Sequence, residues 1–249
     1  MIGLEVTVVD QLVNDGRRLF SSRSLVPLLL FPVVVLALPE SERLAAHIGH
    51  AANLATEWSS LLIALTGVLL RCVTVATAPE GTSSRDTRGL RAPSINRTGM
   101  YSVVRHPLYL GNALMWIGVA ASTRVWWLVV IVGLVYAIYT ERIMAFEEAF
   151  LEESFGDEFR VWAARTPAIF PRWNSWTPAT GDVMWRRVAS EHNGLLAVIA
   201  ITYLLRRDSL LLGLLAVATM VSVVAILARR LPVRDDAALA LHLEDQNMK

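Results

Sequence analysis

Residues 99–112, GMYSVVRHPLYLGN, hold the side chains best suited to chemistry in this chain. Pro107 fixes its own backbone angle φ and disfavours the helical conformation for His106, so a helix is expected to begin at Pro107. Arg105, His106 and Tyr109 then cluster at the mouth of that helix. A guanidinium, an imidazole and backbone N–H groups can together hold a carboxylate. The simpler alternative is an ordinary helix start with an arginine and a tyrosine at a membrane surface.

Residues 147–159, EEAFLEESFGDEF, form a second motif that begins with the paired glutamates Glu147 and Glu148. Carboxylates can hold a ligand ammonium or take a proton from an amine. This pair, together with Arg105 and His106, would suit a zwitterionic ligand that resembles an amino acid. A metal ion fits worse, because one histidine and two carboxylates would leave Arg105 repelling it. We therefore predict no metal site.

The composition of the chain is that of a membrane protein. Of its 249 residues, 54% are hydrophobic and 18% are charged, and the mean hydropathy is +0.46. The formal net charge of +1 gives no bulk attraction to nucleic acid. The single cysteine, Cys72, excludes an internal disulfide and any metal site built from several cysteines.

Six apolar stretches are expected to cross the membrane as helices, so the predicted fold is an all-α, polytopic membrane bundle. They are residues 24–38, 58–78, 108–122, 125–139, 194–205 and 210–228. Only Thr123 and Arg124 separate the third stretch from the fourth, and these two stretches should form a tight helical hairpin. The fourth stretch continues without a helix breaker into charged residues that end in Glu148.

The segments around these stretches have their own expected roles. Residues 39–57 look like a polar connector, in which His47 and His50 lack a third metal ligand, so a solvated loop is favoured. An amphipathic helix is expected over residues 158–164, lying at the membrane surface. By segment, we expect a lead-in at 1–23, two transmembrane helices at 24–78, a core at 79–193, an extra hairpin at 194–228 and a polar tail at 229–249.

The distribution of arginine predicts which loops face the cytoplasm. Residues 79–105 carry five arginines against two acidic residues, so we place this loop and both chain termini on the cytoplasmic side. The two motifs then lie at the two open ends of one helical hairpin, on the same face of the membrane. Charged side chains gathered at one membrane depth predict a polar pocket that faces the cytoplasm.

Together, the two motifs resemble the superfamily of isoprenylcysteine carboxyl methyltransferases and phospholipid methyltransferases. The shared pattern is Gly-x-Tyr-x-x-x-Arg-His-Pro-x-Tyr-x-Gly, then Glu-Glu-x-x-Leu-x-x-x-Phe-Gly-x-x-Phe and Ile-x-Pro, and it covers residues 99–171. Members are integral membrane enzymes that use S-adenosyl-L-methionine. The resemblance implies a multi-pass membrane methyltransferase that acts on a lipophilic small molecule or on a prenylated or lipid substrate.

The resemblance also implies which residues contact the cofactor, namely Tyr101, His106, Pro107, Leu108, Tyr109 and Glu147. Gly111 joins them as a position where a ligand can come close to the backbone. On the acceptor side, relatives carry an arginine shortly before the paired glutamates, and Arg142 is the nearest match. The chain departs from the family pattern at residues 93–96, which contact the cofactor in relatives, and at Phe159, where a tyrosine is usual.

The chemistry implied is methyl transfer to a carboxylate or to an amine. Transfer from a sulfonium to a carboxylate needs positioning in a dry pocket more than acid–base catalysis, and Arg105 or Arg142 could orient an anionic acceptor. For an amine acceptor, Glu148 could take the proton. We therefore name Arg105 and Glu148 as the catalytic residues. Whether the acceptor is an isoprenylcysteine-type carboxylate or a lipid head group, and hence O- or N-methylation, stays open.

Two other functions are also open. A membrane reductase that uses NADPH, of the sterol-reductase kind, has a similar helical core, but no polar stretch here suits its second phosphate group. A non-catalytic membrane scaffold is the other alternative, and it is disfavoured by the intact Arg105, His106, Tyr109 and Glu147. The oligomeric state is not predicted by the sequence.

Overall fold

The computed structural model describes residues 7–22, 29–78, 90 and 92–179, together with positions 188, 191, 194 and 198. Regular structure in this part of the chain is entirely helical, which confirms the all-α class for it. The α-helices are α1 (Val8–Ser22), α2 (Phe31–His47), α3 (His50–Thr77), α4 (Pro107–Ala121), α5 (Trp126–Phe155) and α6 (Asp157–Arg165). Two single-turn 3-10 helices, η2 (Met100–Ser102) and η3 (Trp173–Ser175), also lie in the described part of the chain.

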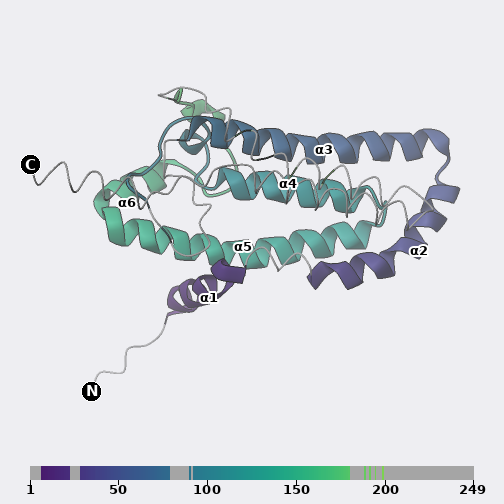
Figure 1. Ribbon diagram of the computed structural model, residues 1–249, viewed down its shortest axis with the longest axis horizontal. Helices are drawn as coiled ribbons and strands as arrows, with labels where there is room; N and C mark the ends of the chain where they lie inside the picture. The colour runs from purple at the N-terminus through teal and green to yellow at the C-terminus, as the bar shows by residue number, and fades with distance from the viewer. Residues whose placement is uncertain are drawn as a thin grey trace, which may run out of the picture.

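Helices α3, α4 and α5 run side by side along the length of the molecule, and α1 packs across α5 (Figure 1). The α2–α3 and α4–α5 turns lie at one end of this bundle. The amino end of α4, the carboxyl end of α5 and α6 lie at the other end (Figure 1). Because the helices alternate in direction, the two sequence motifs meet at this second end.

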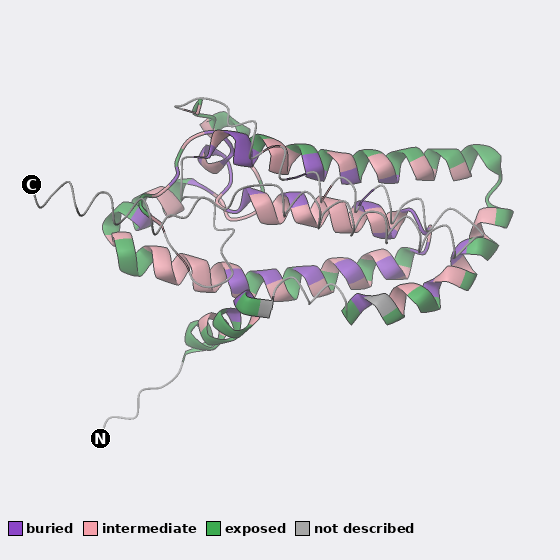
Figure 2. Ribbon diagram, viewed as in Figure 1, coloured by how far each residue is buried: buried purple, intermediate pink, exposed green. Residues whose placement is uncertain are grey.

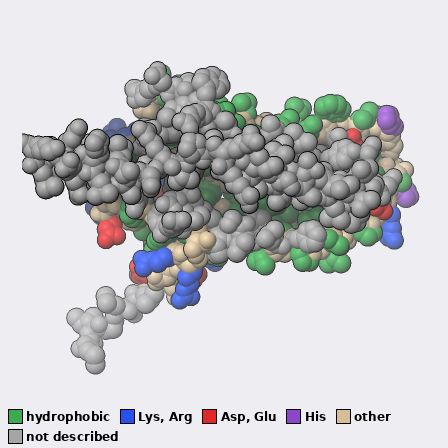
Figure 3. Space-filling model, in the orientation of Figure 1, with side chains coloured by type: hydrophobic (Ala, Val, Ile, Leu, Met, Phe, Trp, Pro, Cys, Tyr) green, Lys and Arg blue, Asp and Glu red, His purple; other side chains and the backbone are tan. Residues whose placement is uncertain are grey.

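Two of the described helices, α3 and α5, are long and apolar enough to cross a membrane, while α4 is a shorter apolar helix. Their outward faces are exposed and their facing sides are buried (Figure 2). On the visible face, hydrophobic side chains border the bundle along its length, whereas charged side chains gather towards its ends (Figure 3). Leu69 of α3 and Leu134 of α5, both more than half exposed, belong to these outward apolar faces. Such faces suit contact with lipid.

The predicted helical hairpin is confirmed. Helices α4 and α5 are joined by a tight turn in which Arg124 has a φ of 66°. Helix α5 continues through the charged residues beyond Glu148, as expected, and α6 covers the predicted amphipathic segment. The last predicted hairpin, residues 194–228, lies outside the described residues except for two positions.

The expected loop at residues 39–57 is wrong, because nearly all of it is helical. Helix α2 continues past Pro39 to His47, and α3 begins at His50. Residues 40–47 are rich in glutamate, leucine, alanine and arginine, which favour helix, and their propensity outweighs the single proline. The chain turns only around Gly49, whose φ of 79° suits glycine. Both histidines are exposed, and no cluster within the described residues could hold a metal ion.

The backbones of α3 and α4 touch through glycines. A Cβ atom placed on Gly67 would overlap the carbonyl oxygen of Gly111. One placed on Gly118 would lie 2.6 Å from the backbone nitrogen of Ala64. Small residues let membrane helices approach this closely, so the contact fixes the start of α4 against α3.

A polar cluster closes the end of the bundle that is remote from the two motifs. Arg124 Nη2 donates to Glu57 at 2.7 Å, and its Nε contacts Asn53. Trp127 Nε1 donates to Glu40 at 2.8 Å. These bonds tie the α4–α5 turn to α2 and α3.

Candidate active site

The apolar residues at the start of the first motif anchor it against α3. Met100, Val103 and Val104 are buried together and pack against Leu70 of α3. The next two residues then lie along the chain that follows α6. Arg105 N donates to the carbonyl oxygen of Pro167 at 2.8 Å, and the following backbone N–H donates to that of Ala168 at 3.1 Å. This pairing sets the depth at which the side chains of the motif enter the site.

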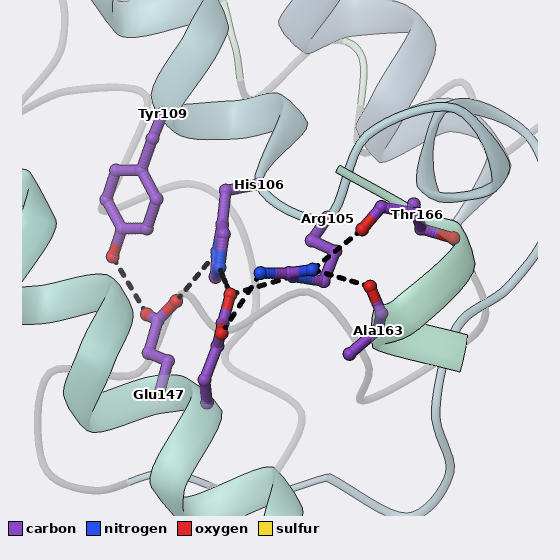
Figure 4. Close-up of polar contacts among 7 residues, drawn as sticks. Arg105, His106, Tyr109, Glu147, Ala163 and Thr166 are labelled. Atoms are coloured by element: carbon purple, nitrogen blue, oxygen red, sulfur yellow. Dashed lines mark hydrogen bonds and ion pairs between the residues drawn. The ribbon is translucent and has the colours of Figure 1, made fainter. Parts of the chain in front are cut away.

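The guanidinium of Arg105 forms hydrogen bonds with two other parts of the site (Figure 4). Its Nε and Nη2 donate to the two carboxylate oxygens of Glu148, at 2.8 and 3.2 Å. Its Nη1 donates to the carbonyl oxygens of Ala163 and Thr166, at 2.8 and 2.7 Å. Bidentate pairing of this kind fixes both partners in orientation. Arg105 therefore joins α5 to the carboxyl end of α6.

His106 stands between the two carboxylates of α5 (Figure 4). Its Nε2 lies 2.8 Å from Glu148 Oε1, and its Nδ1 lies 3.6 Å from Glu147 Oε2. Burial of the ring alone would lower its pKa. The hydrogen bonds and negative charges of the two carboxylates outweigh burial and raise the pKa of His106 above its ordinary value.

The two glutamates differ in how many hydrogen bonds their carboxylates accept from the protein. Glu148 is held by both Arg105 and His106. Glu147 accepts one close hydrogen bond, from the Tyr109 hydroxyl at 2.8 Å, besides the longer approach of His106. An ionised carboxylate has about four acceptor positions. Glu147 thus keeps capacity for a donor from a ligand, while Glu148 is committed to the protein.

Four more of the predicted cofactor residues lie in η2 and in the first turn of α4. Pro107 is buried at the first position of α4, and Tyr101, Leu108 and Tyr109 are half-buried. Gly111 is also buried, but α3 fills the space beside it, since a Cβ there would lie 2.6 Å from Arg71 Cγ. The close neighbour of Gly111 is therefore α3, and its contact with a cofactor stays a prediction.

Arg142 is not brought together with these residues. It lies five residues before Glu147, which turns its direction on the helix by about 140°. Its Nε lies 3.6 Å from Asp15 Oδ2, and its backbone is in contact with Gly16, both on α1. Its predicted role towards the acceptor has no support from this placement.

A second buried polar cluster lies beside the site, and two of its three residues lie outside both sequence motifs. Arg71 of α3 bonds to Asn112 of α4 and to Glu191, which lies after η3. A charged residue inside an apolar stretch was the signal at Arg71, but no motif marks Glu191. Two buried donors also lack a partner within the described chain, Asn96 Nδ2 and Trp162 Nε1.

Comparison with known proteins bears out the resemblance predicted from the two motifs. Residues 55–158, which include most of α3, all of α4 and α5 and both halves of the site, match the phospholipid methyltransferase family. This family lies within the predicted superfamily.

Two curated proteins are similar to part of the chain. The nickel-cobalt-cadmium resistance protein NccN of Alcaligenes xylosoxydans xylosoxydans is 34% identical over 115 residues, which are 46% of this chain and 53% of that protein. The cobalt-zinc-cadmium resistance protein CzcN of Cupriavidus metallidurans is 33% identical over 115 residues, 46% of this chain and 52% of that protein. The match thus spans about half the length of each relative. No solved structure shows a significant match.

Proposed function

We propose that this chain, whose residues 55–158 match the phospholipid methyltransferase family, transfers a methyl group from S-adenosyl-L-methionine to a lipophilic acceptor within the membrane. The observation that carries the proposal is the meeting of His106, Tyr109 and Glu147 at the mouth of α4. A carboxylate with spare acceptor capacity stands there beside a buried imidazole of raised pKa.

The residues at this end of the bundle fit the cofactor. Its ammonium group suits Glu147, which can accept further hydrogen bonds. Its carboxylate and adenine carry acceptor atoms, and two buried donors on segments that flank the site have no partner within the described chain. These are Asn96 Nδ2, in the stretch before η2, and Trp162 Nε1, in α6 one residue before Ala163.

When bound, S-adenosyl-L-methionine supplies a methyl group on a positively charged sulfur. The chain contributes binding, orientation and the exclusion of water. Glu147 binds the ammonium, and Tyr109 orients that carboxylate through its hydroxyl. Glu148 and Arg105 hold α5, α6 and the first motif in register, so we assign them positioning roles in place of direct contact with the acceptor.

We place the protein in the membrane as a multi-pass protein with this site facing the cytoplasm. The apolar outward faces of α3 and α5 support the membrane location. The arginine excess of residues 79–105, which join α3 to the site, supports the orientation. An acceptor with a lipid tail would then reach the site from the bilayer.

The names of the two relatives associate those proteins with metal resistance. Within the described residues, no group of three or more histidine, cysteine or acidic side chains could hold a metal ion. We therefore rest the proposed function on the family and on the site.

Binding of S-adenosylhomocysteine, the demethylated product of the cofactor, tests the proposal. The purified protein in detergent should be stabilised against heat by this ligand, because a ligand that binds only the folded state raises its stability. NADPH should give no shift. A shift with NADPH and none with saturating S-adenosylhomocysteine would favour the reductase alternative, and no shift with either would favour a scaffold.

A further inference from the structure

The segment that follows α6 contains a turn that presents large aromatic side chains to the outside of the protein. Phe170 is 85% exposed, and Trp173 and Trp176 are 61% and 47% exposed. Trp173 begins η3, and Trp176 N donates to the carbonyl oxygen of Trp173 at 3.2 Å. Side chains three residues apart eclipse one another in a 3-10 helix, so the two indoles lie towards one side. We call residues 170–176 the aromatic turn.

The aromatic turn is held in place by the first motif. Arg172 N donates to the carbonyl oxygen of Val103, which is fully buried, at 2.9 Å. Directly after the turn, Thr177 N donates to Ser102 Oγ, and the carbonyl oxygen of Thr177 accepts from Gly99 N, both at 2.9 Å. These bonds fix the backbone of the turn against the protein while its indoles point outwards. The fold itself therefore imposes the exposure of the two tryptophans.

The aromatic turn lies beside the carboxyl end of α3 (Figure 1). A Cβ atom placed on Gly99 would lie 2.9 Å from Thr77 Oγ1 and 3.6 Å from Ala179 Cβ, so α3 ends against the chain that leaves the turn. The outward apolar face of α3 extends to the exposed Val73. Thr77 lies four residues later, about 6 Å farther along the helix. If α3 crosses the membrane, the turn lies at the level of the lipid head groups, where tryptophan is enriched.

The charged side chains around the aromatic turn are positive. Residues 165–179 contain Arg165 and Arg172 and no acidic residue. Both arginines are exposed, and Arg172 Nη1 donates to the carbonyl oxygen of Arg165 at 3.1 Å. The ion pairs that α6 forms among the described residues engage Arg97 and Arg160 and include neither of these two. Two guanidiniums thus stand beside the indoles, available to anions from outside.

We propose that the aromatic turn, together with Arg165 and Arg172, binds the surface of a membrane that contains anionic lipids. This inference rests on the membrane location given under the proposed function. Trp173 and Trp176 lie among the lipid head groups, and the guanidiniums pair with lipid phosphates. A basic surface of this kind is attracted to the negative potential of a leaflet with anionic lipids, and each arginine adds to the attraction.

Binding at this surface bears on the candidate site. The carbonyl oxygens of Pro167 and Ala168, just before the aromatic turn, accept from the backbone N–H groups of Arg105 and His106. The segment that holds the first motif from outside is therefore continuous with the turn. Contact of the turn with lipid would hold this outer wall of the site against the membrane.

A fluorophore on the aromatic turn tests the proposal. The exposed Asn174 lies between the two tryptophans, and NBD is attached to Asn174→Cys of the full chain in a Cys72→Ala background. The protein is placed in phosphatidylcholine nanodiscs with a fixed share of a lipid that carries a quenching nitroxide on its head group. Quenching should rise as phosphatidylglycerol replaces phosphatidylcholine and should fall at high salt. Arg172→Gln should need roughly fivefold more phosphatidylglycerol for equal quenching, the factor expected for one arginine.

A double variant tests the part played by the indoles. Trp173→Ser with Trp176→Ser should lose most of the quenching at every lipid composition, while its melting temperature stays near that of the wild type because both side chains are exposed. Trp126→Ser is the matched control, since Trp126 is 72% exposed but begins α5 at the remote end of the bundle. This control should leave the quenching unchanged. If the double variant does not fold, the Arg172→Gln and salt measurements decide.

The outcomes bear on separate claims. Quenching that responds neither to phosphatidylglycerol nor to salt would overturn the assignment to anionic lipid. Absence of quenching at every composition would show that the turn faces water, another segment of the chain or a partner protein. The membrane location is read separately, from NBD at Leu134→Cys on the outward face of α5, which a nitroxide in the lipid tail should quench. Failure of the proposed methyl transfer is read as absence of S-adenosylhomocysteine binding by the wild type.

Discussion

Glu147 and Glu148 are neighbours in sequence, but their hydrogen-bond partners suit them to different roles. Glu147 is the proposed ligand of the cofactor ammonium, and Glu148 is a positioning residue. If Glu147 accepts hydrogen bonds from the cofactor ammonium, Glu147→Gln should remove a charge-assisted interaction of about 1.5–3 kcal/mol, equal to a tenfold to hundredfold loss in affinity. Titration of S-adenosylhomocysteine into the variant measures this loss. Wild-type affinity would contradict the assignment, since a glutamate that only faces solvent would cost almost nothing to change.

His106 should make the stability of the protein depend on pH. The folded-state pKa of its ring is raised above the unfolded value of about 6.5 by the carboxylates beside it. Its stabilising contribution is therefore complete below about pH 6.5 and is lost as the pH rises through the folded pKa. The melting temperature of the wild type should exceed that of His106→Asn most at pH 6, and the difference should shrink at higher pH. A difference that grows with pH would show that the ring is neutral in the folded state.

Among the helices, α3 and α4 pack too closely at Gly67 to accept added volume. Gly67→Ala would place a methyl group on the backbone of α4, and overpacking of this kind costs about 1–3 kcal/mol. Gly133→Ala is the matched control, because nothing lies within 4 Å of its added Cβ. The control should be neutral or slightly stabilising, by roughly 1 kcal/mol at most, as alanine favours helix. Thermal unfolding in detergent compares the two, and equal melting temperatures would contradict the close packing.

The contact between α1 and α5 explains why Arg142 should not affect the cofactor. Arg142→Ala removes the approach to Asp15 and should loosen α1 while S-adenosylhomocysteine affinity stays at the wild-type value. Limited proteolysis within residues 7–22 and a parallel titration measure the two effects. Collapse of cofactor affinity would place Arg142 in the site after all.

Local sequence signals predicted the helices that hold the site. They did not predict contacts between residues that are far apart in the sequence. Pro107 and the two-residue Thr123–Arg124 connection are local signals, and they correctly predicted the α4–α5 hairpin. The side of α5 that faces α1 could not be predicted, because its contacts with Asp15 and Gly16 join residues far apart in the sequence. The acceptor role of Arg142 was predicted from the resemblance alone, which places an arginine shortly before the paired glutamates. Glu191 was missed because its partner lies 120 residues away and no pattern links the two.

For the whole molecule, the proposed orientation places the site on the cytoplasmic side of the membrane. If the site faces the cytoplasm, cysteines placed at Ser84 and Ser175 in a Cys72→Ala background should resist an impermeant thiol reagent added to intact cells. Both positions should react after the membrane is permeabilised, which controls for burial. Labelling of either from outside would contradict the arginine-based orientation.

The bonds from Arg105 to the end of α6 have a consequence for synthesis of the chain. Its acceptor on Thr166 is made 61 residues later, about 3–12 s at the usual speed of a ribosome. During that interval, the first motif has been translated but most of its partners have not. The nascent chain must therefore carry an unpaired arginine beside the membrane until α5 and α6 have emerged. A chain halted before Ala163 would leave the ribosome with both motifs present but without the carbonyl groups at the end of α6 to which Arg105 donates.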